Sequence, residues 1–351
     1  MSSKLNLDLA KLKADDEFYT SYIDIAAELD NWKDKFRDKN IICPCDFLPD
    51  NNVESITIQF SPLKFYINSV IKKESDFEFD LFGEFAKVKK QKEVSEAVIR
   101  RLLGERNTCN FIYYLWTIAK ETGIKSISAS GYDINTNRGI SFDEVDYGKY
   151  DICITNPPFS LYSAFMECLM EERNKRDFNF IIIAPFMNRV APCVAEPLME
   201  RKLWLGFGRH LAMEFKNPTG GKNKKVAVDW LATWPKAQEE QDKMSYKTGI
   251  LWDKMSYSEM PYMTMKDGTK PIKIKSITEI PDDYKGYMFT SVAVLDKLSY
   301  KEYEWICTGC KSYFNKKHPE LNPFAHKVNN EMIGYGTEDS CFHGILFRKV
   351  D

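Results

Sequence analysis

Short strand-like runs that alternate with helical patterns constrain the fold of this chain most strongly. Strands are expected at residues 41–43, 126–129, 152–154 and 180–183, and two further apolar segments lie at 203–205 and 226–234. Helical patterns stand at residues 21–37, around 113–123 and at 161–173. Apolar strands separated by helices are typical of a parallel sheet that is covered on both faces. The sequence therefore predicts an α/β fold.

The length of 351 residues suggests about two domains at roughly 150 residues each. The polar stretch 236–245 marks a boundary, and the residues after it are aromatic, short-stranded and irregular. We therefore expect one domain at 1–235, with an insertion at about 51–105, and a smaller C-terminal region at 236–351.

The chain lacks any run of the roughly 20 apolar residues that a membrane helix needs. Its first residues also lack the apolar core of a signal peptide, so a cytoplasmic location is expected. The nine cysteines are then expected to be reduced. Cys307 and Cys310 form a Cys-x-x-Cys pair, but a zinc site needs four ligands and no second pair follows. Isolated candidates lie downstream at His318, His326 and Cys341. Free cysteines and no metal are favoured.

The segment that carries chemistry is 150–159. An apolar strand runs directly into Asn156-Pro157-Pro158-Phe159, and a helical pattern follows. In open α/β sheets, ligands bind beyond the carboxyl ends of the strands. Asn-Pro is also an ordinary turn signal, which is the alternative interpretation of this tetrapeptide. The preceding strand, the phenylalanine and the following helix together favour a ligand-binding role.

An exocyclic amine on an aromatic ring is a poor nucleophile, because its lone pair is delocalised into the ring. Two acceptors aimed at its two hydrogens localise that lone pair, and the Asn156 side-chain oxygen and the Pro157 carbonyl can supply them. Pro157 and Pro158 fix the backbone and remove competing N–H groups. Phe159 offers a flat face for a base, where stacking contributes about 1–3 kcal/mol. These residues predict methyl transfer from a sulfonium donor, with positioning as the main source of catalysis.

With this motif, the chain resembles the EcoRI-type adenine-specific DNA methyltransferases. Further similar segments follow in the family's order over about residues 15–306: Asp16-Glu17-Phe18-Tyr19-Thr20 with Tyr22, Asp24-Ile25 and Glu28-Leu29; Cys43-Pro44-Cys45-Asp46; Lys202-Leu203-Trp204-Leu205-Gly206; and Asp282-Asp283-Tyr284-Lys285-Gly286. The resemblance implies a Rossmann-like S-adenosylmethionine-dependent sheet with a C-terminal DNA-recognition region. It also implies transfer to adenine N6 in double-stranded DNA by base flipping, in a bacterial or phage restriction-modification context.

The resemblance also implies cofactor residues. Phe18, Tyr19 and Thr20 would line the methionine end of S-adenosylmethionine, and Cys45 and Asp46 would lie beneath it, with Asp46 holding the amino group. Asp133 follows a strand where an acidic residue often accepts from ribose hydroxyls, although a turn aspartate is the alternative.

Two departures from the family pattern concern this cofactor segment. Asp46 is separated from the Arg106–Phe111 block that normally follows it, so we expect an inserted element between them. The glycine-rich loop of most such enzymes is also absent after the first strand.

Candidates for contact with the substrate lie outside the motif. Phe215 follows the predicted sixth strand and is either a second aromatic for the target base or a core residue. A basic cluster in the insertion predicts DNA contact, with a solvated lysine face as the alternative. Its members are Lys87, Lys89, Lys90 and Lys92.

Two other classes of function remain open at this stage. One is an amino-methyltransferase that acts on RNA or on a protein glutamine, whose amide nitrogen poses the same lone-pair problem. The other is a catalytically silent methyltransferase fold that binds DNA, which the intact motif at Asn156 argues against. The oligomeric state and the recognition sequence do not follow from the sequence.

Overall fold

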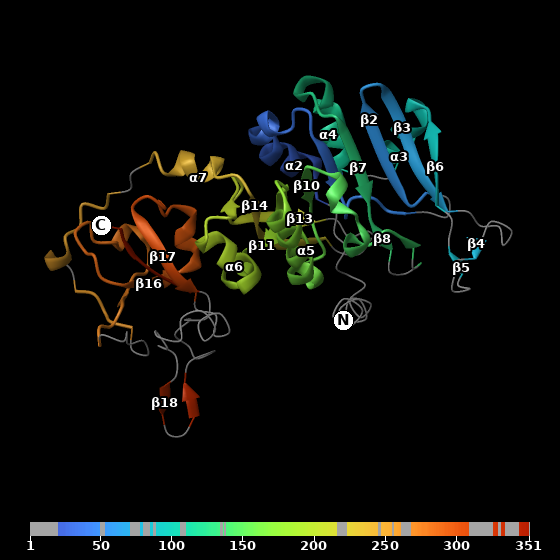
Figure 1. Ribbon diagram of the computed structural model, residues 1–351. Coiled ribbons are helices and arrows are strands. Elements are labelled where there is room, and N and C mark those ends of the chain that lie inside the picture. Colours follow the sequence, from blue (N-terminus) through green and yellow to red (C-terminus); the bar gives the residue numbers. More distant parts are fainter. Residues whose placement is uncertain are drawn as a thin grey trace. The chain divides into compact units, whose positions relative to one another are not determined.

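The computed structural model describes residues 20–49, 53–70, 78–79, 85–86, 89–105, 110–133, 136, 138–215, 223–244, 247–254, 256–260, 268–308, 326–328, 331–333 and 344–350. The chain divides into two compact units (Figure 1). The first comprises Met1–Ala184 and Leu211–Ala232, and the second comprises Pro185–His210 and Thr233–Asp351. The segment Pro185–His210, expected in the first domain, thus groups with the second unit.

The centre of the first unit is a set of four parallel strands in the order β7-β1-β10-β11. These strands are β7 (Ser126–Ser130), β1 (Asn40–Cys43), β10 (Ile152–Thr155) and β11 (Asn179–Pro185). Ile41 of β1 pairs with Ile127 on one side and with Ile152 on the other, and all three side chains are buried. These are the four strands expected from the sequence. The predicted α/β class is therefore confirmed, within a sheet that is mixed and not purely parallel.

The region between β1 and the helix at Asn110–Thr122 adds antiparallel strands to this sheet. It contains β2 (Ser55–Phe60), β3 (Leu63–Val70), β6 (Lys89–Val94) and the helix α3 (Glu96–Glu105). β2 pairs antiparallel with β7, and β3 and β6 follow outward, so β6 is last in the strand order. Figure 1 shows these strands in blue and cyan beside β7. The expected insertion is thus an extension of the central sheet.

The helices of the first unit are α2 (Tyr22–Leu29), α4 (Asn110–Thr122) and α5 (Tyr162–Lys175). Ser21 caps α2 by accepting a hydrogen bond from the Asp24 N–H at 3.2 Å. Gly123, in the left-handed region at φ +73°, ends α4. The helix expected at 21–37 is shorter than predicted, because it changes into a 3₁₀ helix at Asp30–Lys35. Its predicted apolar face is still fully buried: Ile25, Leu29, Trp32 and Phe36.

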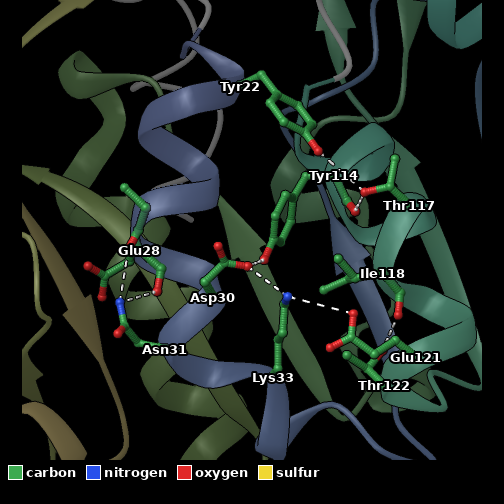
Figure 2. Close-up of polar contacts among 11 residues, drawn as sticks. Tyr22, Glu28, Asp30, Asn31, Lys33, Tyr114, Thr117, Ile118, Glu121 and Thr122 are labelled. Carbon is green, nitrogen blue, oxygen red and sulfur yellow. Dashed lines mark hydrogen bonds and ion pairs between the residues drawn. The ribbon is translucent and has the colours of Figure 1, made fainter.

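A polar network ties this N-terminal segment to α4 (Figure 2). The Tyr114 hydroxyl donates to Asp30 at 2.6 Å, and the Lys33 ammonium lies 2.9 Å from Asp30 and 3.7 Å from Glu121. The hydrogen bond from Tyr114 is the main cause that lowers the pKa of Asp30. These contacts fix α4 beside the N-terminal helix, which matters because both helices approach the candidate site.

Several further strands and 3₁₀ helices complete the first unit. The strands are β4 (Glu78–Phe79), β5 (Phe85–Ala86), β8 (Tyr132–Asp133), β9 (Arg138–Gly139), β13 (Leu211–Phe215) and β14 (Lys224–Ala232). The remaining 3₁₀ helices are Phe142–Glu144, Tyr147–Lys149 and Phe159–Leu161. β13 and β14 form an antiparallel pair, and β14 follows β11 in the strand order.

The second unit holds a four-stranded sheet in the order β15-β16-β20-β17. Its strands and helices are β12 (Trp204–Leu205), β15 (Ile272–Lys273), β16 (Met288–Ser291), β17 (Tyr303–Thr308), β18 (His326–Val328), β19 (Glu331–Ile333), β20 (Gly344–Lys349), α6 (Pro192–Met199) and α7 (Lys236–Gln241), with 3₁₀ helices at Phe186–Val190, Trp252–Lys254, Ile277–Glu279 and Val292–Asp296. Across the described parts of both units, no helix is long and apolar enough to span a membrane.

Candidate active site

The candidate site lies at the carboxyl edge of the parallel strands in the first unit. Because neighbouring parallel strands are in register, the loops that follow them leave the sheet at the same edge. The loop after β10 carries Asn156 and Phe159, the loop after β1 carries Cys45 and Asp46, and Asp133 follows β7. The fold therefore brings residues from three distant sequence segments to one edge.

The Asn156-Pro157-Pro158-Phe159 segment forms a rigid link between β10 and α5. Pro157 is buried, while Asn156 and Phe159 are half-buried. Pro158 has φ −61° and ψ 124°, and its carbonyl accepts from the Leu161 N–H at 3.1 Å. The two prolines thus hold the Pro157 carbonyl on a backbone with little freedom, as the motif chemistry requires.

Phe215 lies against this motif. Its ring centroid is 5.8 Å from that of Phe159, with the ring planes at 86°, an edge-to-face arrangement. Phe215 ends β13, where its register partner is Lys224 of β14, and its side chain is 1% exposed. Both sequence interpretations of Phe215 therefore describe part of its setting: it is buried, and it contacts the motif phenylalanine.

Asp46 and the first turn of α4 meet despite the insertion between them. The Asp46 carboxylate accepts a hydrogen bond from the Ile112 N–H at 2.9 Å. Burial raises the pKa of Asp46 well above its usual range, and hydrogen bonds from the Ile112 and Phe111 N–H groups oppose that shift. The carboxylate thus caps α4, a role that sequence reasoning missed. The strands β2, β3 and β6 of the insertion pair one after another outward from β7. The chain then returns to α4, whose first turn still contacts Asp46.

Thr20 reaches the same helix turn from the N-terminal segment. The Asn110 side-chain amide donates to the Thr20 carbonyl at 2.7 Å. Thr20 is 5% exposed, and its hydroxyl has no hydrogen-bond partner among the described residues. Phe18 and Tyr19, the other two predicted residues of this segment, lie outside the described residues. A buried hydroxyl in this position fits a binding site for a polar ligand.

The loop after β1 is fastened to the end of β7. The N–H groups of Asp46 and Phe47 donate to the Ser130 carbonyl at 3.1 and 3.2 Å. A Cβ atom at Gly131 would stand 2.2 Å from the Phe47 carbonyl oxygen, so only glycine allows this approach. The partly exposed Cys45 lies in this loop. The packing holds the loop in place without the glycine-rich sequence that the chain lacks.

Asp133 is half-buried in β8, and its carboxylate accepts from the Thr136 hydroxyl at 2.8 Å. A local bond of this kind is typical of a turn aspartate, while the position after β7 is the one expected for a ribose-binding carboxylate. Both interpretations of Asp133 therefore remain compatible with its surroundings.

The predicted basic cluster lies on the strand β6. Lys89, Lys90 and Lys92 belong to this strand, and Lys92 is exposed. Lys87 lies outside the described residues. β6 is the last strand in the order of the ten-stranded sheet.

The described residues do not form a metal site around the Cys-x-x-Cys pair. Cys307 belongs to β17, and Cys310, His318 and Cys341 lie outside the described part of the chain. His326 belongs to β18. Among the residues that the structure describes, no group of three or more His, Cys, Asp or Glu side chains could hold a metal ion.

Comparison with known proteins identifies the family. The family model described as "Adenine-specific methyltransferase EcoRI" matches residues 6–341. The type II methyltransferase M.EcoRI of Escherichia coli is 26% identical over 327 residues, which cover 86% of this chain and 88% of that protein. The type II methyltransferase M.MpnI of Mycoplasma pneumoniae is 23% identical over 345 residues, which cover 92% of each. No solved structure matches the chain.

The family match covers nearly the whole chain and includes the strand that leads into Asn156, as well as both structural units. Methyltransferases of this kind use S-adenosylmethionine as a class. This chain therefore belongs to the EcoRI-type family of adenine-specific methyltransferases and methylates adenine N6 at specific sites in DNA.

Proposed function

We propose that the enzyme turns its target adenine out of the duplex and holds it at the carboxyl end of β10. The observation that carries this proposal is the contact between Phe159 and Phe215, which gathers two aromatic rings beside Asn156. An adenine inside the duplex has its amine hydrogen-bonded and both ring faces covered. Extrusion costs a few kcal/mol, and stacking on an aromatic ring returns about 1–3 kcal/mol.

Asn156 and Pro157 act on the amine of the extruded base. The Asn156 side-chain oxygen and the Pro157 carbonyl accept from its two hydrogens, which localises the nitrogen lone pair. The proline backbone keeps the carbonyl in position, so little reorganisation accompanies the reaction. Phe159 holds the ring plane. Together these residues orient the nitrogen for in-line attack, which is the main contribution of positioning to the rate.

The cofactor cradle in this proposal surrounds the first turn of α4. Thr20 and Asp46 would hold the methionine end, and Asp133 the ribose, with Cys45 in the loop below. The unpartnered Thr20 hydroxyl and the buried Asp46 carboxylate support this fit. S-adenosylmethionine supplies an electrophilic methyl group when it is bound.

Target recognition is assigned to the second unit. The catalytic motif, Thr20 and Asp46 all belong to the first unit, whereas the four-stranded sheet β15-β16-β20-β17 belongs to the second. With the segment Pro185–His210 included, this recognition unit is larger than the 236–351 region expected from sequence. Double-stranded DNA is the proposed substrate. The proposed location is the bacterial cytoplasm, where that DNA is found. Transfer to RNA or to a protein glutamine is disfavoured by the adenine-specific family match.

Base extrusion is tested with 2-aminopurine in place of the methylated adenine. Its fluorescence is expected to rise on binding, because the probe leaves the stack. A mismatch opposite the target is expected to strengthen binding, since an unpaired base is easier to extract. Stacking on Phe159 can quench the probe again, and the Phe159→Ala variant removes that quenching. Unchanged fluorescence with both proteins, together with equal affinity for matched and mismatched DNA, would argue for a base that stays in the helix.

The basic strand β6 is expected to contact DNA phosphates. Replacing Lys87, Lys89, Lys90 and Lys92 by glutamine should flatten the dependence of DNA affinity on salt. Each lost phosphate contact reduces the log–log slope by about 0.9. The matched control replaces Lys149 and Lys175, which pair with Asp146 and Glu171 outside the insertion. Equal slopes for wild type and the β6 variant would leave these lysines as a solvated face.

A further inference from the structure

Trp230 is a fully buried residue whose indole N–H has no acceptor among the described residues. It belongs to β14, and its side chain is 0% exposed. A buried indole N–H usually donates to a partner, and a buried polar group without one requires an explanation. A phenylalanine would serve the packing as well, and an acceptor on a bound ligand would account for the nitrogen.

The ring of Trp230 lies beside the first turn of α4. Its centroid is 6.1 Å from that of Phe111, with the ring planes at 66°. The N–H groups of Phe111 and Ile112 donate to the Asp46 carboxylate, so the same helix turn contacts both the indole ring and that carboxylate. Trp230 therefore belongs to the surroundings of the proposed cofactor cradle.

A second donor without a partner lies at the same helix turn. The Thr20 hydroxyl is buried and unpartnered among the described residues, and the Thr20 carbonyl is held by Asn110, the first residue of α4. Thr20 and Trp230 come from opposite ends of the first unit. Each of these two buried donors thus belongs to a residue that contacts the first turn of α4, Thr20 through Asn110 and Trp230 through Phe111.

The site of the target base is a poorer explanation for this indole. Phe215 marks that site through its contact with Phe159, and its register partner on β14 is Lys224. Trp230 stands six residues further along the same strand, which corresponds to about 20 Å at about 3.3 Å per residue. The indole is therefore not one of the two rings that mark the site of the base, and its one described ring contact is with Phe111.

We propose that the Trp230 N–H and the Thr20 hydroxyl bind the carboxylate at the amino-acid end of the methyl donor. This inference rests on the proposed cofactor cradle and adds Trp230 to it. The amino-acid end carries an ammonium and a carboxylate, so it needs an acceptor and donors side by side. Asp46 supplies the acceptor, and the two unpartnered groups supply the donors. A hydrogen bond to a charged group is stronger than one between neutral groups, which suits a buried site.

Calorimetry with two ligands tests this assignment without turnover. S-adenosylhomocysteine carries the whole amino-acid end, and its decarboxylated analogue keeps the amine but lacks the carboxylate. Wild type is expected to prefer S-adenosylhomocysteine by about 10-fold or more, the effect of one or two hydrogen bonds to a charged group. In Trp230→Phe this preference should shrink to about twofold, because phenylalanine keeps the packing against Phe111 but removes the donor.

Three further variants complete the test. Thr20→Val removes only the hydroxyl and should also reduce the preference for the carboxylate, which keeps the test open if Trp230→Phe does not fold. Asp46→Asn should weaken both ligands alike, because it affects the ammonium that they share. Trp204→Phe, in the second unit, should leave both affinities unchanged.

The proposal fails if wild type and both donor variants discriminate between the two ligands equally. It also fails if Trp230→Phe weakens both ligands to the same extent, since the indole would then act through packing alone. Neither result bears on Asp46, whose part in the cofactor cradle is tested separately by Asp46→Asn. A wild-type enzyme that binds neither ligand would instead contradict the proposed function as well.

Discussion

Replacing Asn156 by alanine is expected to slow methyl transfer by about 10²–10³-fold or more. The side chain provides one of the two acceptors that prepare the amine, and loss of a single group that stabilises a transition state costs this much in other enzymes. Cofactor affinity should not change, because Asn156 acts on the base and not on the donor. Single-turnover rates and calorimetry with S-adenosylhomocysteine measure the two effects separately.

Asn156→Asp is the matched control for this prediction. Aspartate keeps an oxygen acceptor at the same position, so it should recover part of the rate that alanine loses. The proposed role of Asn156 would be wrong if the folded alanine variant lost cofactor binding. It would also be wrong if aspartate and alanine were equally impaired although thermal unfolding showed that both variants were folded.

Replacing Phe159 by alanine is expected to reduce catalytic efficiency by roughly 5- to 150-fold, which corresponds to the 1–3 kcal/mol of one aromatic stack. Phe159→Tyr and Phe159→Trp should retain most of the activity, because only the flat face is needed. Tyrosine is the closer control, since it adds one hydroxyl to a ring that is only half-buried. Rates at several DNA concentrations show whether the loss arises in binding or in transfer.

The contact between Phe159 and Phe215 offers a second comparison. Loss of activity in Phe159→Ala through a collapsed core would also lower thermal stability and disturb Phe215. Loss through missing base contact would leave the unfolding temperature close to that of wild type. If tyrosine, tryptophan and alanine at Phe159 were equally active, stacking on this ring would have no part in the reaction.

The core of the fold follows from the sequence because the parallel strands are buried on both faces. Three adjacent strands contain the buried residues Ile41, Ile127 and Ile152. Each belongs to a short apolar run, which is typical of a buried strand. The motif after β10 was predictable for a related reason, since strand ends in such sheets face the ligand. Residues 152–159 thus predicted both a central strand of the sheet and the catalytic motif that follows it.

The strands of the insertion were not predictable in the same way. β6 has the sequence Lys-Lys-Gln-Lys-Glu-Val, in which only one residue is apolar, because a strand at the end of the order needs little apolar surface. Its partner β3 is what identifies it as a strand. The contact between Asp46 and the first turn of α4 also depends on pairing between distant segments, which a local sequence pattern does not predict.

The N-terminal helix illustrates a different limit. The spacing of Ile25, Leu29, Trp32 and Phe36 predicts one face correctly, but it does not distinguish a continuous α helix from one that tightens into a 3₁₀ turn. That turn begins at Asp30, which is engaged by Tyr114 and Lys33 (Figure 2). The conformation there is set by tertiary contacts, and these become visible only in the folded chain.

Methyl transfer to adenine is tested most directly by mass spectrometry of nucleosides from duplex DNA incubated with the enzyme and S-adenosylmethionine. N6-methyladenine should appear with wild type and be nearly absent with Asn156→Ala. Appearance of N4-methylcytosine without N6-methyladenine, or of equal N6-methyladenine with both proteins, would contradict the assignment of Asn156 and its neighbours to adenine methylation.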